Sequence, residues 1–308
     1  MKLVVRIVTA AAAVSAFVVG ASAAAATPAG PNAAGMTVGA ADVAGAKVVS
    51  QGSLAKGSFL SAYQRTLALS QPYGRSLIVA VRSQSMLAQN PEEVGAEFGQ
   101  LQTVLKLKAG RAGFAHGVAI GAHVKDSAVK LGAMRHPHVG DAAIELPITL
   151  KTKKGTLYES VLFMRFDRTF LELILGAVHP VALPDAVRLA KVMQAHATQQ
   201  LTPIELTAPV VTGTPDVGQT LTVTPGTYTN TDVAHGYQWQ RCDATGANCV
   251  AIAGATTSTY VVSNDDAGAT LDVVETATDR FAAPTATSAA TAAVPVPAPA
   301  PPAPAPAP

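Results

Sequence analysis

The 308-residue sequence predicts a multidomain protein in which an α+β layer domain is followed by an all-β sandwich. Two observations lead to this fold class. Residues 47–202 show helical and strand-like hydrophobic patterns in the order α-β-α-β-β-β-α, which indicates helices layered on a sheet. Residues 203–294 hold roughly seven short strand-like runs between turn residues, at the 8–12-residue spacing of a sandwich.

The N-terminal 26 residues predict a secretory signal peptide. Lys2 and Arg6 precede an apolar run, and the small residues Ala21-Ser22-Ala23 form a cleavage site. The apolar run is shorter than the ~20 residues of a membrane span, and no Cys near the cleavage site is available for lipid attachment. We therefore expect a secreted, extracellular chain that keeps no transmembrane segment. Residues 27–46, mainly small and almost uncharged, predict a flexible linker.

The α+β domain at 47–202 begins with a short helical candidate at 60–69 and a buried strand at 76–82. A helix is expected to open at Asn90-Pro91, because Asn caps helices, Pro suits the first turn, and Glu92 and Glu93 complement the helix dipole. It should end near Leu107. Three strands and a closing helix follow, at 142–150, 157–166, 170–177 and 184–197.

The run Val139-Gly-Asp-Ala-Ala143, taken together with Phe163–Leu173, weakly resembles small exported sensor and lipoprotein domains of the Mog1/PsbP-like type. The resemblance implies an exported α+β domain, and no functional residue is carried over from it.

The all-β region centres on Tyr237–Cys242, where the only tryptophan of the chain, Trp239, lies in a run with strand periodicity. A single indole in a short strand is typical of the centre of a two-sheet core. Cys242 and Cys249 are separated by six residues that include Gly246, so they can face each other across a hairpin. The export signal and the lack of a flanking His favour a disulfide over a metal site.

Five segments carry a resemblance to a known family: Gly213–Val223, Pro225–Tyr228, Tyr237–Asp243, Gly246–Thr256 and Thr259–Leu271. Residues 205–294 resemble the bacterial immunoglobulin-like modules of exported proteins of high-GC Gram-positive bacteria. The resemblance implies an immunoglobulin-like β-sandwich that serves as a spacer or adhesion module. The chain departs from antibody-type domains because its cysteines clip one hairpin and no Tyr follows Gly268 to form a tyrosine corner. The Pro/Ala-rich tail at 295–308 predicts a semi-rigid extended stalk.

No motif for a catalytic nucleophile, a nucleotide or a dinucleotide occurs in the sequence, so we expect no enzyme activity and no cofactor. The alternative is a metal-dependent or other enzyme activity in the α+β domain, centred on His136, His138 and Asp141. Two imidazoles beside a carboxylate are metal-ligand types, although an exposed loop around Pro137 explains the same pattern.

Charge is divided between the two regions: 41–202 has 18 Lys and Arg against 11 Asp and Glu, while 203–308 has 2 against 9. The domains either dock on each other, or the basic one meets an anionic envelope polymer or another envelope protein. Nucleic acid is disfavoured by the export signal. The candidate contact residues form two clusters, Lys106, Lys108 and Arg111, and Lys151, Lys153 and Lys154. These observations favour a non-catalytic binding protein of the cell envelope or the medium.

Overall fold

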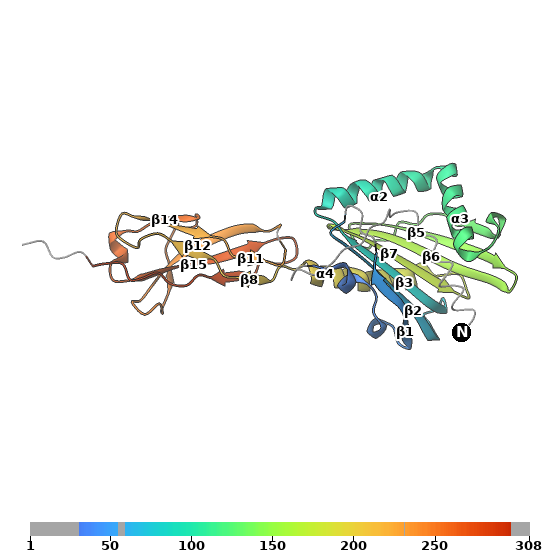
Figure 1. Cartoon of the computed structure of the whole chain (residues 1–308), viewed down its shortest axis with the longest axis horizontal. Helices are drawn as coiled ribbons and strands as arrows, with labels where there is room; N and C mark the ends of the chain where they lie inside the picture. The colour runs from blue at the N-terminus through green and yellow to red at the C-terminus, as the bar shows by residue number, and fades with distance from the viewer. Residues whose placement is uncertain (1–30, 55–58, 231, 297–308) are drawn as a thin grey trace, which may run out of the picture. The chain divides into compact units, whose positions relative to one another are not determined.

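The computed structural model describes residues 31–54, 59–230 and 232–296 (Figure 1). The chain divides into two compact units, Met1–Gln200 and Leu201–Pro308, which we call the first and the second unit. The predicted signal peptide and residues 297–308 of the predicted tail lie outside the described residues.

The first unit is built on a seven-stranded antiparallel sheet with strand order β1-β2-β3-β7-β6-β5-β4. Helices α2 (Pro91–Lys106) and α3 (Lys108–Ala122) lie along one side of the sheet, and α4 (Leu183–Leu201) lies along the other (Figure 1). The strands are β1 (Ala46–Ser53), β2 (Ser61–Tyr73), β3 (Ile78–Leu87), β4 (Val129–Leu131), β5 (Ala142–Thr152), β6 (Gly155–Phe166) and β7 (Thr169–Ala177).

Aromatic rings join the two helices α2 and α3 to the sheet. Phe98 of α2 lies 6.3 Å from Phe170 of β7, and Phe114 of α3 lies 6.4 Å from Phe163 of β6, measured between ring centroids. Asn90 accepts a hydrogen bond from the Glu93 N–H and so caps α2, as the sequence predicts. The α+β architecture, its three-stranded meander and its closing helix are confirmed.

The predicted helix at 60–69 is wrong, because this segment belongs to β2. β2 pairs with β1 along one edge and with β3 along the other, so its backbone groups are satisfied between strands. The intrinsic preferences of residues 60–69 carry no information about the partner strands β1 and β3. Strands β1 and β4 were not predicted either.

Helix α3 was also missed, since Gly110, Gly113, Gly117 and Gly121 lower its intrinsic helix propensity. Burial of Phe114 and Val118 against the sheet compensates. Gly110 is required at the corner between the helices, because a Cβ there would lie 2.0 Å from the Val104 carbonyl oxygen.

Residues 33–46, predicted as part of a flexible linker, pack onto the first unit and correct that prediction. They form the 3₁₀ turns η2 (Ala33–Met36) and η3 (Ala40–Asp42), and Met36, Val38 and Val43 are fully buried. Hydroxyl groups of the sheet accept hydrogen bonds from the segment, as Ser83 does from the Val38 N–H at 3.0 Å.

The second unit consists of small antiparallel sheets. A four-stranded sheet has the order β13-β12-β15-β16, a three-stranded sheet the order β14-β10-β9, and a two-stranded sheet pairs β11 with β8. The strands are β8 (Glu205–Thr207), β9 (Val210–Thr212), β10 (Thr220–Thr224), β11 (Thr227–Tyr228), β12 (Ala234–Cys242), β13 (Val250–Ala251), β14 (Thr259–Val261), β15 (Thr270–Thr278) and β16 (Thr285–Thr287). Seven of these strands lie where the sequence predicts strand-like runs, but the last predicted run, 286–294, is a strand only at β16, and β8 and β11 were not expected.

Trp239 is the centre of the core of the second unit. It is 0 % exposed and packs with Leu221 and Val223 of β10 and with Leu271 and Val273 of β15. Its indole N–H donates to the Thr257 carbonyl oxygen at 2.9 Å, so this polar atom is satisfied despite its burial. The core of the second unit therefore contains residues of both the three-stranded and the four-stranded sheet.

Candidate functional site

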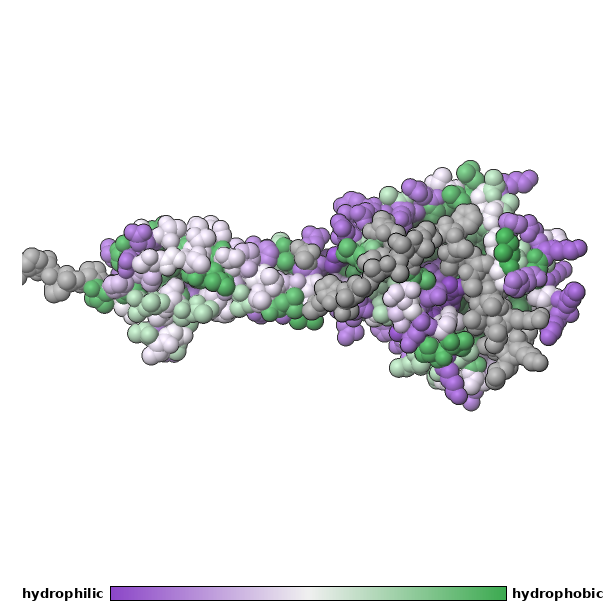
Figure 2. Space-filling model, viewed as in Figure 1, coloured by the Kyte–Doolittle hydropathy of each residue, from purple (hydrophilic) through white to green (hydrophobic). Residues whose placement is uncertain are grey.

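Lys151, Lys153 and Lys154 lie at the free end of the β5–β6 hairpin, where all three are exposed. Lys130 of β4 pairs with Thr149 of β5, so its diagonal neighbour on the same face of the sheet is Lys151. The set is completed by the exposed Lys125, which precedes the η4 turn (Asp126–Ala128) leading into β4. We call these five residues the lysine end; Figure 2 shows hydrophilic residues gathered at this end of the first unit.

The lysine end carries little compensating negative charge. No carboxylate of the described residues forms an ion pair with any of the five lysines. The adjacent Asp126 is engaged by His116 of α3, whose Nδ1 lies 2.9 Å from a carboxylate oxygen. Sequence reasoning missed Lys125 and Lys130, because only the pairing of β4 with β5 brings them to the hairpin.

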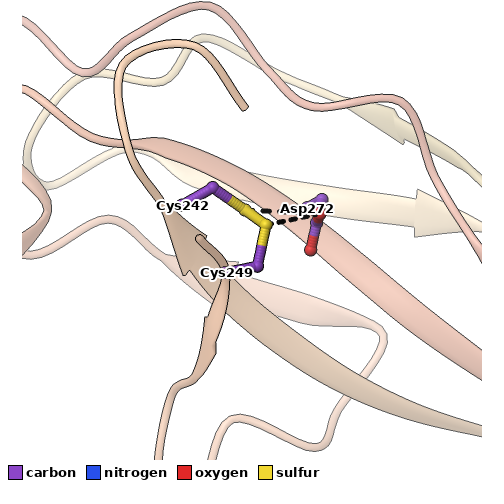
Figure 3. Close-up of side chains that lie close together, drawn as sticks. All are labelled: Cys242, Cys249 and Asp272. Atoms are coloured by element: carbon purple, nitrogen blue, oxygen red, sulfur yellow. Dashed lines mark hydrogen bonds between the residues drawn. A yellow bond between two sulfur atoms is a disulfide. The ribbon is translucent and has the colours of Figure 1, made fainter. Parts of the chain in front are cut away.

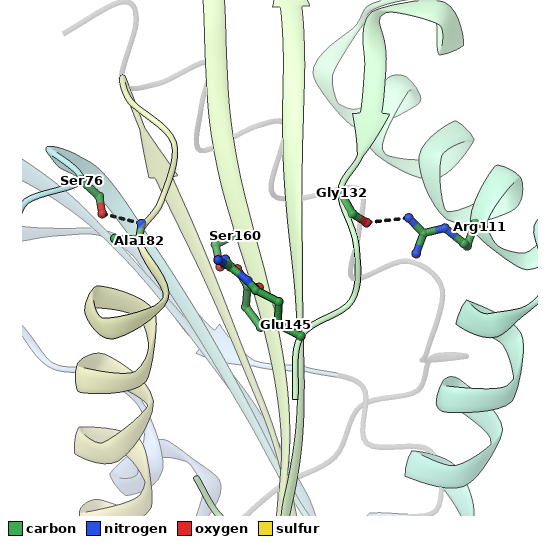
Figure 4. Close-up of polar contacts among 7 residues, drawn as sticks. Ser76, Arg111, Gly132, Glu145, Ser160 and Ala182 are labelled. Carbon is green, nitrogen blue, oxygen red and sulfur yellow. Dashed lines mark hydrogen bonds and ion pairs between the residues drawn. The ribbon is translucent and has the colours of Figure 1, made fainter. Parts of the chain in front are cut away.

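The second predicted cluster is separate from the lysine end. Lys106 and Lys108 are exposed at the corner between α2 and α3, on either side of Leu107, which is 58 % exposed. Helix α3 runs between this corner and η4, a length of about 22 Å for 15 residues. Arg111 is half-buried and donates to the carbonyl oxygen of Gly132 at 2.7 Å (Figure 4), so it holds α3 against the segment after β4.

His136, His138 and Asp141 are exposed and do not form a metal-ligand cluster. Asp141 Oδ2 instead accepts a hydrogen bond of 2.6 Å from the Asp167 N–H, which fixes the turn between β6 and β7. Within the described part of the chain, the one group of potential metal ligands lies in the second unit and consists of Cys242, Cys249 and Asp272.

The predicted disulfide between Cys242 and Cys249 is confirmed (Figure 3). It closes the loop between β12 and β13, and Asp243 organises that loop by accepting hydrogen bonds from Thr245, Ala247 and Asn248. These bonds, first that of the Thr245 hydroxyl, hold the pKa of Asp243 well below its usual range.

Asp272 of β15 lies against the disulfide. Its Oδ2 is 3.4 Å from Cys242 Sγ and 3.5 Å from Cys249 Sγ (Figure 3), and the residue is 5 % exposed. Its other oxygen, Oδ1, is buried with no hydrogen-bond partner among the described residues. Burial raises the pKa of this carboxyl.

Several other buried polar groups of the first unit are structural. Glu145 of β5 accepts hydrogen bonds from Arg135 and from the Ser160 hydroxyl, which pins the segment before β5 to the sheet (Figure 4). The Ser76 hydroxyl donates to Asp185 at 2.6 Å. It also accepts from the Ala182 N–H (Figure 4), and the two bonds tie the start of α4 to the β2–β3 connection.

Two carboxyl groups on the face of the sheet that α2 and α3 cover have raised pKa values. Burial raises the pKa of Glu159 on β6 to about 8, and both of its carboxylate oxygens lack a hydrogen-bond donor among the described residues. Burial also raises the pKa of Glu172 on β7, to about 7, with Arg82 on β3 opposing the shift. Neither residue stood out in the sequence, because each lies in an otherwise apolar strand.

In the second unit, Asp266 connects three elements. It accepts hydrogen bonds from Arg241 of β12, from the Tyr260 hydroxyl of β14 and from Ser263 before the η5 turn (Asn264–Asp266). Burial opposes ionisation, but these hydrogen bonds hold the pKa of Asp266 below its usual range. The Asp-x-Gly corner of the sequence pattern thus has a structural role.

Among the described residues no helix combines the length and apolar character that crossing a membrane requires. Comparison with protein-family models, with curated proteins and with solved structures found no match for this chain.

Proposed function

We propose that this chain is an exported, non-catalytic binding protein whose first unit holds an anionic polymer of the cell envelope at the lysine end. The observation that carries the proposal is the set of five exposed lysines on β4, on the β5–β6 hairpin and just before η4, with no carboxylate of the described residues paired to them. Each ammonium is a point charge on a flexible stem, which suits a polymer of repeating charges. The corner at Lys106 and Lys108 offers a second point of contact to a long polymer.

The second unit supports this function as an immunoglobulin-like spacer. The Trp239 core between two sheets and the disulfide-clipped hairpin agree with the resemblance of residues 205–294 to bacterial immunoglobulin-like modules. Export is supported by the N-terminal sequence pattern and by the disulfide, which persists in oxidising compartments.

Binding of the full chain to a soluble inorganic polyphosphate tests the proposal. We expect the triple variant Lys151→Ala, Lys153→Ala, Lys154→Ala to bind roughly 100-fold more weakly at low salt, since each lysine near an anionic surface contributes about 1 kcal/mol. The affinity of the unchanged chain should fall steeply as salt increases, because charge contacts displace counterions.

The matched control is the triple variant Lys47→Ala, Arg75→Ala, Lys191→Ala, which removes the same charge from exposed positions elsewhere on the first unit. It should keep most of the affinity. Equal losses in the two triple variants would show attraction to net charge alone, and binding that does not respond to salt would contradict the proposal.

A further inference from the structure

The carboxyl group of Asp272 lacks the partners that a buried carboxyl normally has. Oδ1 has no hydrogen-bond partner among the described residues, and the neighbours of Oδ2 are two disulfide sulfurs, which carry no proton to donate. Asp272 is 5 % exposed, so its position is not explained by solvation at the surface. A buried polar group without partners requires an explanation, and a bound ion is one of them.

Of the three distances between Cys242 Sγ, Cys249 Sγ and Asp272 Oδ2, the two that involve the oxygen match a tetrahedral metal site. Ligands at 2.3 Å for sulfur and about 2.0 Å for oxygen lie roughly 3.5 Å apart in a tetrahedron. Asp272 Oδ2 already lies 3.4 Å and 3.5 Å from the two sulfurs. Only the distance between the two bonded sulfurs is too short for such a site, and lengthening it requires reduction of the disulfide.

The geometry points to a reduction-gated site for a zinc-like divalent cation formed by Cys242, Cys249 and Asp272. This inference goes beyond the proposed polymer binding and does not depend on it. A dithiol reductant gives two electrons and two protons to the Cys242–Cys249 bond, which breaks to give two thiols while the reductant becomes a disulfide. The cation then releases the two thiol protons, and any proton on Asp272, to solvent. Both thiolates and the carboxylate bind it, and water fills the fourth position.

The surroundings of the disulfide allow reduction followed by cation binding. Cys249 is exposed, so reductant and cation reach the pair, while Cys242 and Asp272 are held on the paired strands β12 and β15. The loop between the cysteines keeps the hydrogen bonds that Asp243 accepts from Thr245, Ala247 and Asn248, and none of these bonds uses a sulfur atom.

The test is a titration of the full chain with Co²⁺ and then Zn²⁺, after reduction by a phosphine and removal of the reductant under argon. We expect one Co²⁺ per reduced chain, with a thiolate-to-cobalt charge-transfer absorption that Zn²⁺ abolishes. The oxidised chain should show no such absorption. Asp272→Asn should weaken binding about 100-fold or more, because loss of an outer-shell partner alone typically costs 10–100-fold.

Asp265→Asn, which removes an exposed carboxylate of the same unit, is the matched control and should bind like the unchanged chain. The double variant Cys242→Ser, Cys249→Ser should show no charge-transfer absorption. The inference is overturned if the reduced chain shows no thiolate absorption, if Asp272→Asn binds as tightly as the unchanged chain, or if Trp239 fluorescence shows that reduction unfolds the second unit.

Discussion

Glu159 lies within β6 at 1 % exposure, and neither carboxylate oxygen meets a donor among the described residues. Its pKa is about 8 in the folded chain, above the value near 4.5 of a free Glu side chain. The folded chain therefore binds a proton that the unfolded chain has released between these two values. Stability falls as pH rises through this window, by an amount on the order of a few kcal/mol.

Glu159→Gln removes this titration and keeps the shape of the side chain. We expect it to raise the free energy of unfolding of the first unit by roughly 2 kcal/mol at pH 9 and to change it little at pH 5, as measured by denaturant unfolding followed by far-ultraviolet circular dichroism. Glu92→Gln, at an exposed position in the first turn of α2, is the control and should show no comparable difference between the two pH values. An equal gain at both pH values would contradict the explanation.

At the scale of elements, the segment that contains η2 and η3 acts as part of the fold of the first unit. Met36 is 0 % exposed, and the segment is held by hydrogen bonds to Ser61 and Ser83 of the sheet and by His196 of α4. A flexible linker would have none of these contacts.

Met36→Ala should therefore destabilise the first unit by about 2–4 kcal/mol, the usual effect of emptying a buried methionine site. Val49→Ala on β1, where the side chain is 49 % exposed, should cost much less. Equilibrium denaturation of both variants measures the difference. Equal stability of Met36→Ala and the unchanged chain would mean that the segment does not pack in solution.

At the scale of the whole molecule, the two units have separate cores and only the second carries a disulfide. The loop that it closes is short, so the bond contributes about 2–2.5 kcal/mol on the loop-entropy estimate. Reduction should lower the stability of the second unit by this amount and leave that of the first unit unchanged.

Fluorescence of Trp239, the single tryptophan, reports on the second unit alone, while hydrogen exchange of the β6 and β7 amides reports on the first. The double variant Cys242→Ser, Cys249→Ser should start at the lower stability and not respond to reductant. If reduction changed amide protection in β6 and β7, the two units would be coupled.

The sequence alone was enough to predict the α+β region followed by an all-β region, most of the strands and the Cys242–Cys249 bond. These features depend on short-range information. Period-two alternation marks β12, the cap at Asn90 marks the start of α2, and the two cysteines are seven positions apart in the sequence. Within such segments the local pattern and the final fold agree.

Tertiary structure decided the rest. Pairing with β1 and β3 made 61–73 a strand, and burial of Phe114 made the glycine-rich 108–122 a helix. The lysine end forms because β4 pairs with β5, and Asp272 reaches the cysteines because the β12–β15 register sets it diagonally beside Cys242. Each of these outcomes depends on contacts between residues far apart in the chain. The free energy of these contacts exceeds the local conformational preference, and the local sequence pattern does not reveal them.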